Sequence, residues 1–367
     1  MIRSGRSAAV IGAALAITVA LGCGSASSAA AKQAVSPCGT TNAPTWSPDG
    51  TQIAWFGYRW PRPHGHANGT YNTLRAICVS DADGKNLHKV PNTVCSERCS
   101  NALREGVGQL AWAQPNVLLA GMDTGIATVP IGQKPKLLAK TGPTLFSTDA
   151  SGDRVASGLY ADGCSGCHGP VKVFSVPSGA LVGQVGGTKL FNGDPSLSPD
   201  GTQLVFTRSS GKSPEAKPSI WTASAGGSHL QRLEQSGTNP LWSPAGNQIA
   251  YFVPKATSLV WRVVSPQGGT STTLLKSGPG TVFGWSPNGK WIAYPDSKGR
   301  LALIDVATKK VRTLLKLHLP YSASSVAWSP DSQQLLVVSR PPAHTSCPSG
   351  LWRVPIDGMK PHLVHGC

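Results

Sequence analysis

One combination of residues, a turn followed by a short apolar run, recurs along most of the chain. Its first copy is Trp46-Ser47-Pro48-Asp49-Gly50, which is followed by the apolar residues 53–56. Four further strong copies and two weaker ones follow, at a mean spacing of about 47 residues. A repeat of this length is typical of architectures in which one supersecondary unit is stacked many times. The first residues of the seven copies are Trp46, Trp112, Phe146, Leu197, Trp242, Trp285 and Trp328.

The residues of the repeat predict strands and not helices. Ser-Pro-Asp-Gly has the preferences of a type I turn, with Ser first, Pro second and Gly fourth. The apolar runs 53–56 and 335–338 do not alternate with polar residues, so both faces of these strands are expected to be buried. No segment after residue 22 has a helical apolar period over three turns, and the 30 prolines argue against long helices.

Two more strand-like segments complete each repeat. In the first repeat they are 74–80 and 87–90, joined by the turn 81–86. In the last repeat they are 350–356 and 361–364. Four strands in each repeat predict an all-β chain over residues 44–367, folded as a β-propeller of about seven four-stranded blades.

Residues 1–22 have the pattern of a signal peptide of the lipoprotein type. Arg3 and Arg6 precede the apolar stretch 7–21, which is shorter than the roughly 20 residues that a membrane-spanning helix needs. The box Ala20-Leu21-Gly22-Cys23 predicts lipid attachment at Cys23, with 23–43 as a flexible tether, so that the protein is anchored to the outer face of a bacterial membrane. The alternative is cleavage near Ala29-Ala30-Ala31, which gives a soluble secreted protein.

The charge of the chain favours an anionic partner outside the cytoplasm. When residues 1–22 leave with their two Arg, the formal net charge falls from +16 to +14. An exported basic protein meets anionic lipid head groups and cell-wall polymers. No nucleic-acid motif is present. We therefore expect another envelope protein or an anionic envelope polymer as the partner, no nucleic acid, and a monomeric propeller.

The nine cysteines indicate an oxidising compartment. If Cys23 carries lipid, eight remain, which is an even number that suits four disulfides. Cys164-Ser165-Gly166-Cys167-His168 also matches the attachment motif of c-type haem, but its Gly-rich surroundings offer no haem domain, so we expect a disulfide and no cofactor. The predicted pairs are Cys164 with Cys167 and Cys347 with Cys367; for Cys38, Cys78, Cys95 and Cys99 three pairings stay open, with Cys38–Cys78 and Cys95–Cys99 preferred.

The Trp-Ser-Pro-Asp-Gly repeats resemble the WD-like propeller repeats of TolB and of the N-terminal propellers of dipeptidyl-peptidase-like proteins. The resemblance covers residues 44–367 and implies a fold, not an activity. TolB has six blades and an extra α/β domain, unlike this chain, so its partners are not implied. The Gly-x-Ser-x-Gly motif of the peptidases is absent from this sequence.

The longer connections between strands are expected on one face of the propeller. They are 59–73, 158–170, 208–218 and 340–349 within blades, and 91–106 between the first two blades. Loops on a rigid scaffold often carry recognition, so this face is the predicted partner-binding surface, the alternative being tolerated surface insertions. His64 and His66 could bind a metal ion with His344, but they lie in a Pro/Gly loop without nearby carboxylates, so no metal is expected. The candidate partner-binding residues are Arg59, Trp60, Arg62, His64, His66, Arg208, Arg340 and His344.

Together these features favour an extracytoplasmic, membrane-anchored binding module over an enzyme. Propeller enzymes need convergent carboxylates or a metal near the channel, whereas Asp49, Asp200 and Asp331 already belong to turns. No catalytic residue is therefore assigned. The alternative is an extracytoplasmic hydrolase or lyase with a site at the central channel, and a third possibility is a structural envelope protein without a dedicated ligand.

Overall fold

The fold was examined in a computed structural model. It describes residue 38 and the ranges 40–59, 74–91, 109–122, 125–141, 144–159, 168–187, 189–209, 217–255, 258–278, 284–296, 298, 300–315, 326–339 and 350–366. The chain divides into Met1–Val35, which lies outside these residues, and Ser36–Cys367, which holds every strand described below. No helix in these ranges has the length and apolar character needed to span a membrane.

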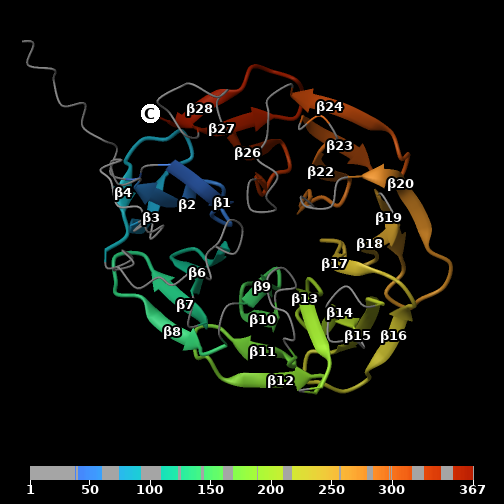
Figure 1. The fold of residues 1–367 in the computed structure, drawn as a ribbon. Helices are drawn as coiled ribbons and strands as arrows, with labels where there is room; N and C mark the ends of the chain where they lie inside the picture. Colours follow the sequence, from blue (N-terminus) through green and yellow to red (C-terminus); the bar gives the residue numbers. More distant parts are fainter. Residues whose placement is uncertain are drawn as a thin grey trace, which may run out of the picture. The chain divides into compact units, whose positions relative to one another are not determined.

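In the described ranges, 28 strands form six hydrogen-bonded sheets arranged around a common axis (Figure 1). Five sheets have four antiparallel strands in chain order. The first is β1 (Thr40–Trp46), β2 (Gln52–Arg59), β3 (Leu74–Asp81) and β4 (His88–Lys89); the second is β5 (Leu110–Gln114), β6 (Val117–Met122), β7 (Gly125–Pro130) and β8 (Lys136–Ala139). The other three are β17 (Thr238–Trp242), β18 (Ile249–Lys255), β19 (Ser258–Val264) and β20 (Thr272–Gly278); β21 (Gly284–Trp285), β22 (Trp291–Pro295), β23 (Leu301–Asp305) and β24 (Val311–Leu315); and β25 (Val326–Trp328), β26 (Gln334–Ser339), β27 (Gly350–Pro355) and β28 (His362–His365).

The sixth sheet corrects the expectation of seven separate blades. Its eight strands are β9 (Thr144–Thr148), β10 (Arg154–Leu159), β11 (Val171–Ser175), β12 (Leu181–Val185), β13 (Phe191–Leu197), β14 (Gln203–Ser209), β15 (Ser219–Ser224) and β16 (Gln231–Glu234). Two antiparallel groups, β9–β12 and β13–β16, are joined by one parallel pair, Leu159 with Gly193.

Two glycines explain why these groups merge. A Cβ atom added to Gly158 would lie 2.8 Å from Pro195 Cδ, and one added to Gly193 would lie 2.4 Å from the Leu159 carbonyl oxygen. Without side chains at these positions, β10 and β13 come close enough to pair. The all-β, propeller-like fold is therefore confirmed, whereas seven separate four-stranded sheets are not observed.

The Ser-Pro-Asp-Gly segments form the predicted turns, held by their own side chains. Ser47 Oγ donates to Asp49 Oδ1 at 2.6 Å and accepts from the Gln52 amide at 2.9 Å. Gly50 has a φ of +72°, which favours glycine. Hydrogen bonds from Ser47 and Thr51 hold the pKa of the Asp49 carboxyl below its ordinary value. The same arrangement recurs around Ser198 with Asp200 and Ser329 with Asp331.

The third repeat is aligned differently from the prediction. The strand register places Thr148, and not Phe146, at the position of Trp46, because Thr148 pairs with Val155 as Trp46 pairs with Ile53. In the turn that follows, Asp149 accepts from Ser151 Oγ at 3.0 Å and from the Arg154 amide at 3.1 Å. Serine and aspartate have thus exchanged places in this turn, which explains why the motif was assigned two residues too early.

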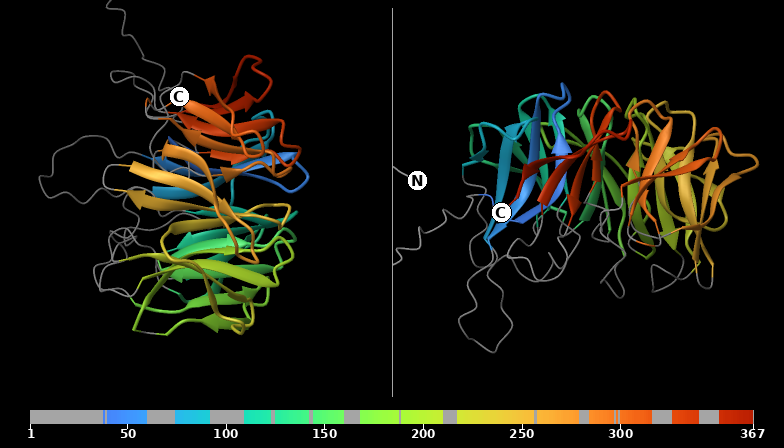
Figure 2. Two further views of the ribbon diagram at one scale, coloured as in Figure 1. Left: turned by 90° about the vertical axis from the view of Figure 1, so that its right-hand side faces the viewer. Right: turned by 90° about the horizontal axis from the view of Figure 1, so that it is seen from above.

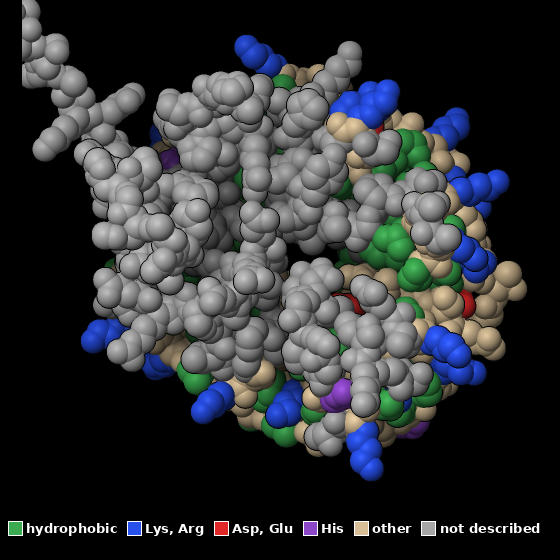
Figure 3. Space-filling model, in the orientation of Figure 1, with side chains coloured by type: hydrophobic (Ala, Val, Ile, Leu, Met, Phe, Trp, Pro, Cys, Tyr) green, Lys and Arg blue, Asp and Glu red, His purple; other side chains and the backbone are tan. Residues whose placement is uncertain are grey.

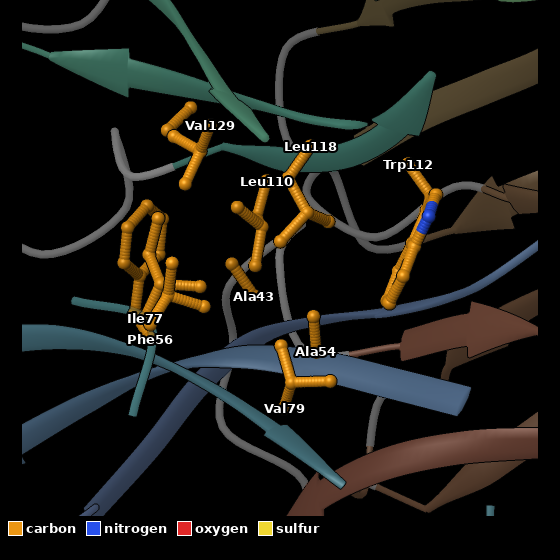
Figure 4. Close-up of a cluster of buried hydrophobic side chains, with 11 residues drawn as sticks. Ala43, Ala54, Phe56, Ile77, Val79, Leu110, Trp112, Leu118 and Val129 are labelled. Carbon is orange, nitrogen blue, oxygen red and sulfur yellow. The ribbon is translucent and has the colours of Figure 1, made fainter. Parts of the chain in front are cut away.

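Buried apolar clusters join each group of strands to the next. In Figure 4, Phe56 and Ile77 from the first sheet lie in one cluster with Leu118 and Val129 from the second. Burying a side chain of this size contributes about 1.5–3 kcal/mol. Corresponding clusters join β5–β8 to β9–β12, β9–β12 to β13–β16, β13–β16 to β17–β20, β17–β20 to β21–β24, β21–β24 to β25–β28, and β25–β28 to β1–β4.

The first and last sheets close the ring by packing and not by sharing a strand among the described residues. Arg353 Nη1 donates to the Ala82 carbonyl at 3.1 Å, and the rings of Trp55 and His365 lie 5.3 Å apart. A disulfide joins Cys38, which precedes β1, to Cys78 of β3, inside the cluster that closes the ring. The preferred Cys38–Cys78 pairing is thereby confirmed.

Removing this disulfide is expected to destabilise the protein by about 2–4 kcal/mol, because the link closes a 40-residue loop in the unfolded chain. Equilibrium denaturation of the double variant Cys38→Ala/Cys78→Ala against the wild type measures the change. In reducing buffer the two proteins should differ much less, which separates the covalent link from lost packing. Equal midpoints under oxidising conditions would contradict a stabilising role.

Candidate functional site

The strands run between two faces, seen from the side in Figure 2. The face that carries the turns at Gly50, Gly201, Gly246 and Gly289, between the first and second strands of their groups, is called the turn face. The opposite face is called the loop face. There the second strands end, the third strands begin and the chain passes from one group to the next. The described chain enters the propeller at the loop face, because β1 runs from there to the turn at Gly50.

Most of the predicted site residues lie outside the described ranges. Arg59 is the last residue of β2, at the loop face. Arg208 is described in full, and Cys38 and Cys78 form the disulfide. The remaining predicted residues, which lie outside the described ranges, are Trp60, Arg62, His64, His66, Arg340, His344, Cys23, Cys95, Cys99, Cys164, Cys167, Cys347 and Cys367.

Among the described residues, charge is divided unequally between the two faces. At the loop-face ends of the described strands every exposed charged side chain is a lysine, whereas Asp194 is buried, Glu234 is half-buried and Asp296 is paired with Arg300 at 2.6 Å. The turns of the opposite face carry exposed aspartates as well as lysines. Figure 3 shows Lys and Arg side chains along the rim of the molecule. The exposed loop-face lysines are Lys89, Lys140, Lys189, Lys217, Lys255, Lys276 and Lys298.

Arg208 is a buried cation near the loop-face end of β14, and not part of a loop as expected. Strand β14 extends through Ser209 because Arg208 pairs with Asn192 on one side and Ser219 on the other. The Arg208 side chain is only 9% exposed. Its guanidinium carbon lies 4.6 Å from the centre of the Trp221 ring and 5.3 Å from that of Phe206. Burial lowers the pKa of the guanidinium, which remains charged at neutral pH.

One neutral side chain holds the guanidinium in place. Arg208 Nε donates to Asn192 Oδ1 at 2.8 Å, and in the described part of the chain this is the only side-chain hydrogen bond of Arg208. Asn192 is fully buried, and its Nδ2 donates to the Gly169 carbonyl at 2.7 Å and the Leu190 carbonyl at 3.2 Å. The two ion pairs within the described ranges involve other residues. The guanidinium therefore has no carboxylate partner there.

A second polar group lies on the innermost strands, on the other side of β13 and β14. The backbone N–H of Asn239 on β17 donates to Thr207 Oγ1 at 3.0 Å, and the Thr238 hydroxyl lies 3.5 Å from Asp194 Oδ2. Asp194 is 8% exposed and has a φ of +49°. Ala43 and Asn239 have the same backbone conformation as Asp194, and all three residues directly precede a proline. The conformation is therefore a repeated feature of the innermost strands. Of the three residues, Asp194 is the one with a carboxyl group.

Neighbouring innermost strands are further joined through side chains. Ser147 Oγ accepts from the Leu197 amide at 3.1 Å, and Ser196 Oγ accepts from the Trp242 amide at 3.0 Å. These bonds link β9 to β13 and β13 to β17.

Sequence reasoning missed Asn192 and Asp194. Both belong to the stretch Phe191-Asn192-Gly193-Asp194-Pro195, which ends two residues before the anchor Leu197. An amide and a carboxyl group so close to an anchor residue were the available signal. No group of three or more His, Cys, Asp or Glu within the described residues is arranged to hold a metal ion.

Comparisons with known proteins show the fold but not the family. No family model matches the sequence. A segment of 111 residues is 29% identical to the uncharacterized peptidase YuxL of Bacillus subtilis, and it covers 28% of this chain and only 17% of that protein.

The structural similarities are broader. An oligogalacturonate lyase solved in complex with manganese has a TM-score of 0.60, at 11% identity over 85% of this chain and 88% of its own. A second oligogalacturonate lyase, from Vibrio parahaemolyticus, has a TM-score of 0.58 at 12% identity over 80% and 85%. TolB from Acinetobacter baumannii is also similar, with a TM-score of 0.47, 15% identity and coverage of 84% and 79%. At these identities the similarity concerns the propeller fold alone.

Asn192→Ala is expected to destabilise the protein by about 2–5 kcal/mol, because it removes the Asn192 partner of the buried Gly169 carbonyl and of the Arg208 Nε–H, while the Leu190 carbonyl keeps its bond from the Gly169 amide. The matched control is Gln267→Ala, which removes one exposed hydrogen bond from the Ser265 hydroxyl and should cost less than about 1 kcal/mol. Urea denaturation of the two variants gives the comparison. Similar small losses for both would show that Asn192 does not hold this site together.

Proposed function

We propose that this chain is an exported, membrane-anchored propeller with seven blades, whose loop face binds an anionic ligand of the cell envelope. The eight-stranded sheet counts as two blades in this proposal, because β9–β12 and β13–β16 each have the antiparallel order of the other blades. The Cys38–Cys78 disulfide supports an oxidising, extracytoplasmic compartment. The anchor in the proposal is lipid on Cys23.

The observation that carries the binding function is the charge of the loop face. Its exposed charged side chains, within the described ranges, are all lysines, so this part of the surface attracts an approaching anion. Attraction of this kind raises association rates and is screened over about 8 Å at physiological salt. The turn face, with exposed aspartates such as Asp200 and Asp331 among its lysines, lacks this uniform sign.

Charge reversal on the two faces tests the proposal. We expect Lys189→Glu/Lys217→Glu/Lys298→Glu to weaken binding to carboxymethyl dextran at least about tenfold, since each lysine near an anionic surface contributes about 1 kcal/mol. The control Lys309→Glu/Lys310→Glu/Lys360→Glu changes the net charge equally on the turn-face side and should have little effect. Neutral dextran should not bind to any of the proteins. Equal losses in both triple variants would show that only net charge matters and would contradict a loop-face site.

A lyase or hydrolase acting at the channel is a second candidate, favoured by Asp194. This carboxyl is buried on an innermost strand beside the Thr238 hydroxyl, where a general base could be held. The similar folds with the higher TM-scores include lyases that act on oligogalacturonate, by their names. Resemblance of fold alone does not transfer that activity.

For this second candidate, Asp194→Asn should reduce turnover by at least about 100-fold, because a general base is lost while asparagine tolerates the same backbone conformation. Turnover is measured on oligogalacturonate and on ester, lactone and glycoside substrates, with Asp331→Asn, a turn variant, as the control. If the wild-type protein converts none of these substrates, the enzyme candidate fails and the binding function is unaffected.

A further inference from the structure

Arg208 is an unusual residue for the interior of a propeller. A buried charge is normally paired with an opposite charge, because its transfer from water is costly. Here the partners in the described part of the chain are one amide oxygen and two aromatic rings. None of these supplies a negative charge. Among the described residues, the cation of Arg208 therefore has ring faces and an amide oxygen beside it but no opposite charge.

The geometry also leaves donors available. A guanidinium has five N–H groups, and the one on Nε is used by Asn192. The four N–H groups on Nη1 and Nη2 have no hydrogen-bond partner among the described residues. Two of them lie parallel in a planar fork, whose spacing matches the two oxygens of a carboxylate. Asn192 and Trp221 restrict the orientation of this fork before any ligand arrives.

The described chain near Arg208 carries further positive charge, and the two acids on its neighbouring strands, Asp194 and Glu234, take part in neither of the ion pairs of the described residues. Asn192 is bonded to the carbonyls of Gly169 and Leu190, and Leu190 follows the exposed Lys189. Ser219, which donates to the Arg208 carbonyl, follows the exposed Lys217 by two residues. The lysines can attract an anion from solution, while Arg208 offers a fixed direction for its bonds.

From these observations we infer that Arg208 is a specific anchor for a carboxylate group of the anionic ligand, at the loop-face junction of β10–β11 with β13–β15. This inference rests on the proposed binding function and names the chemical group that the site selects. The carboxylate accepts hydrogen bonds from the Nη groups, and the neighbouring lysines remain available for other charges of the same polymer. The other role for Arg208 is to cover the apolar cluster between the two groups of strands, without any ligand.

The test compares Arg208→Lys with the wild type on three polymers: carboxymethyl dextran, dextran sulfate and polyphosphate. Lysine keeps the charge but loses the planar fork, so we expect carboxymethyl dextran to bind at least about tenfold more weakly, and the other two polymers to change less than about threefold. The matched control is Arg312→Lys, because Arg312 also lies over a tryptophan, Trp291, at 4.7 Å, but is exposed on β24. It should bind all three polymers as the wild type does.

Two further measurements separate the outcomes. Thermal denaturation of Arg208→Lys and of Arg208→Gln shows whether either variant is folded at the temperature of the assay. Unchanged binding of carboxymethyl dextran by folded Arg208→Lys overturns the inference and leaves the lysine surface intact as the binding face. An equal loss for all three polymers also overturns it, because the site would then not distinguish carboxylate. If the wild type binds none of them, the proposed function fails as well.

Discussion

The fold depends on the face-to-face packing of neighbouring sheets. The second strand of the first blade shows how this works: Ile53 and Trp55 belong to the cluster shared with the last sheet, whereas Ala54 and Phe56 belong to the one shared with the second sheet. A single strand thus supplies two interfaces, and none of these four side chains is more than 6% exposed. The middle of this strand therefore consists of apolar side chains.

This constraint explains why much of the fold could be predicted from the sequence. Runs without alternation, such as 335–338, have to be buried on both faces, and the turn before this run is held by a local hydrogen bond between Ser329 and Asp331. Both signals lie within a few residues. The joining of β10 to β13 is different, because it depends on Gly158 and Gly193, which lie 35 residues apart and meet only in the folded state. A pattern within one repeat does not contain that contact.

The site could be predicted less well, for a related reason. The loop face was identified from the lengths of the connections, and the described strand order agrees with that assignment. The burial of Arg208 was not identified from the sequence, because it comes from pairing with Asn192 and Ser219 and from the ring of Trp221. Asn192 and Asp194 were missed because their importance depends on neighbours from other strands: Gly169 for one, and Thr238 for the other.

The two kinds of positive charge on the loop face differ in what they can recognise. An exposed lysine is surrounded by water and counter-ions, so its attraction is short in range and nearly indifferent to the chemistry of the anion. Arg208 is in a less polar environment, where a hydrogen bond to an anion is stronger and an ill-fitting partner is costly. In the proposed binding mode, the exposed lysines attract the anion and the buried guanidinium selects its carboxylate, while the pairing of β14 with β13 and β15 holds Arg208 in place.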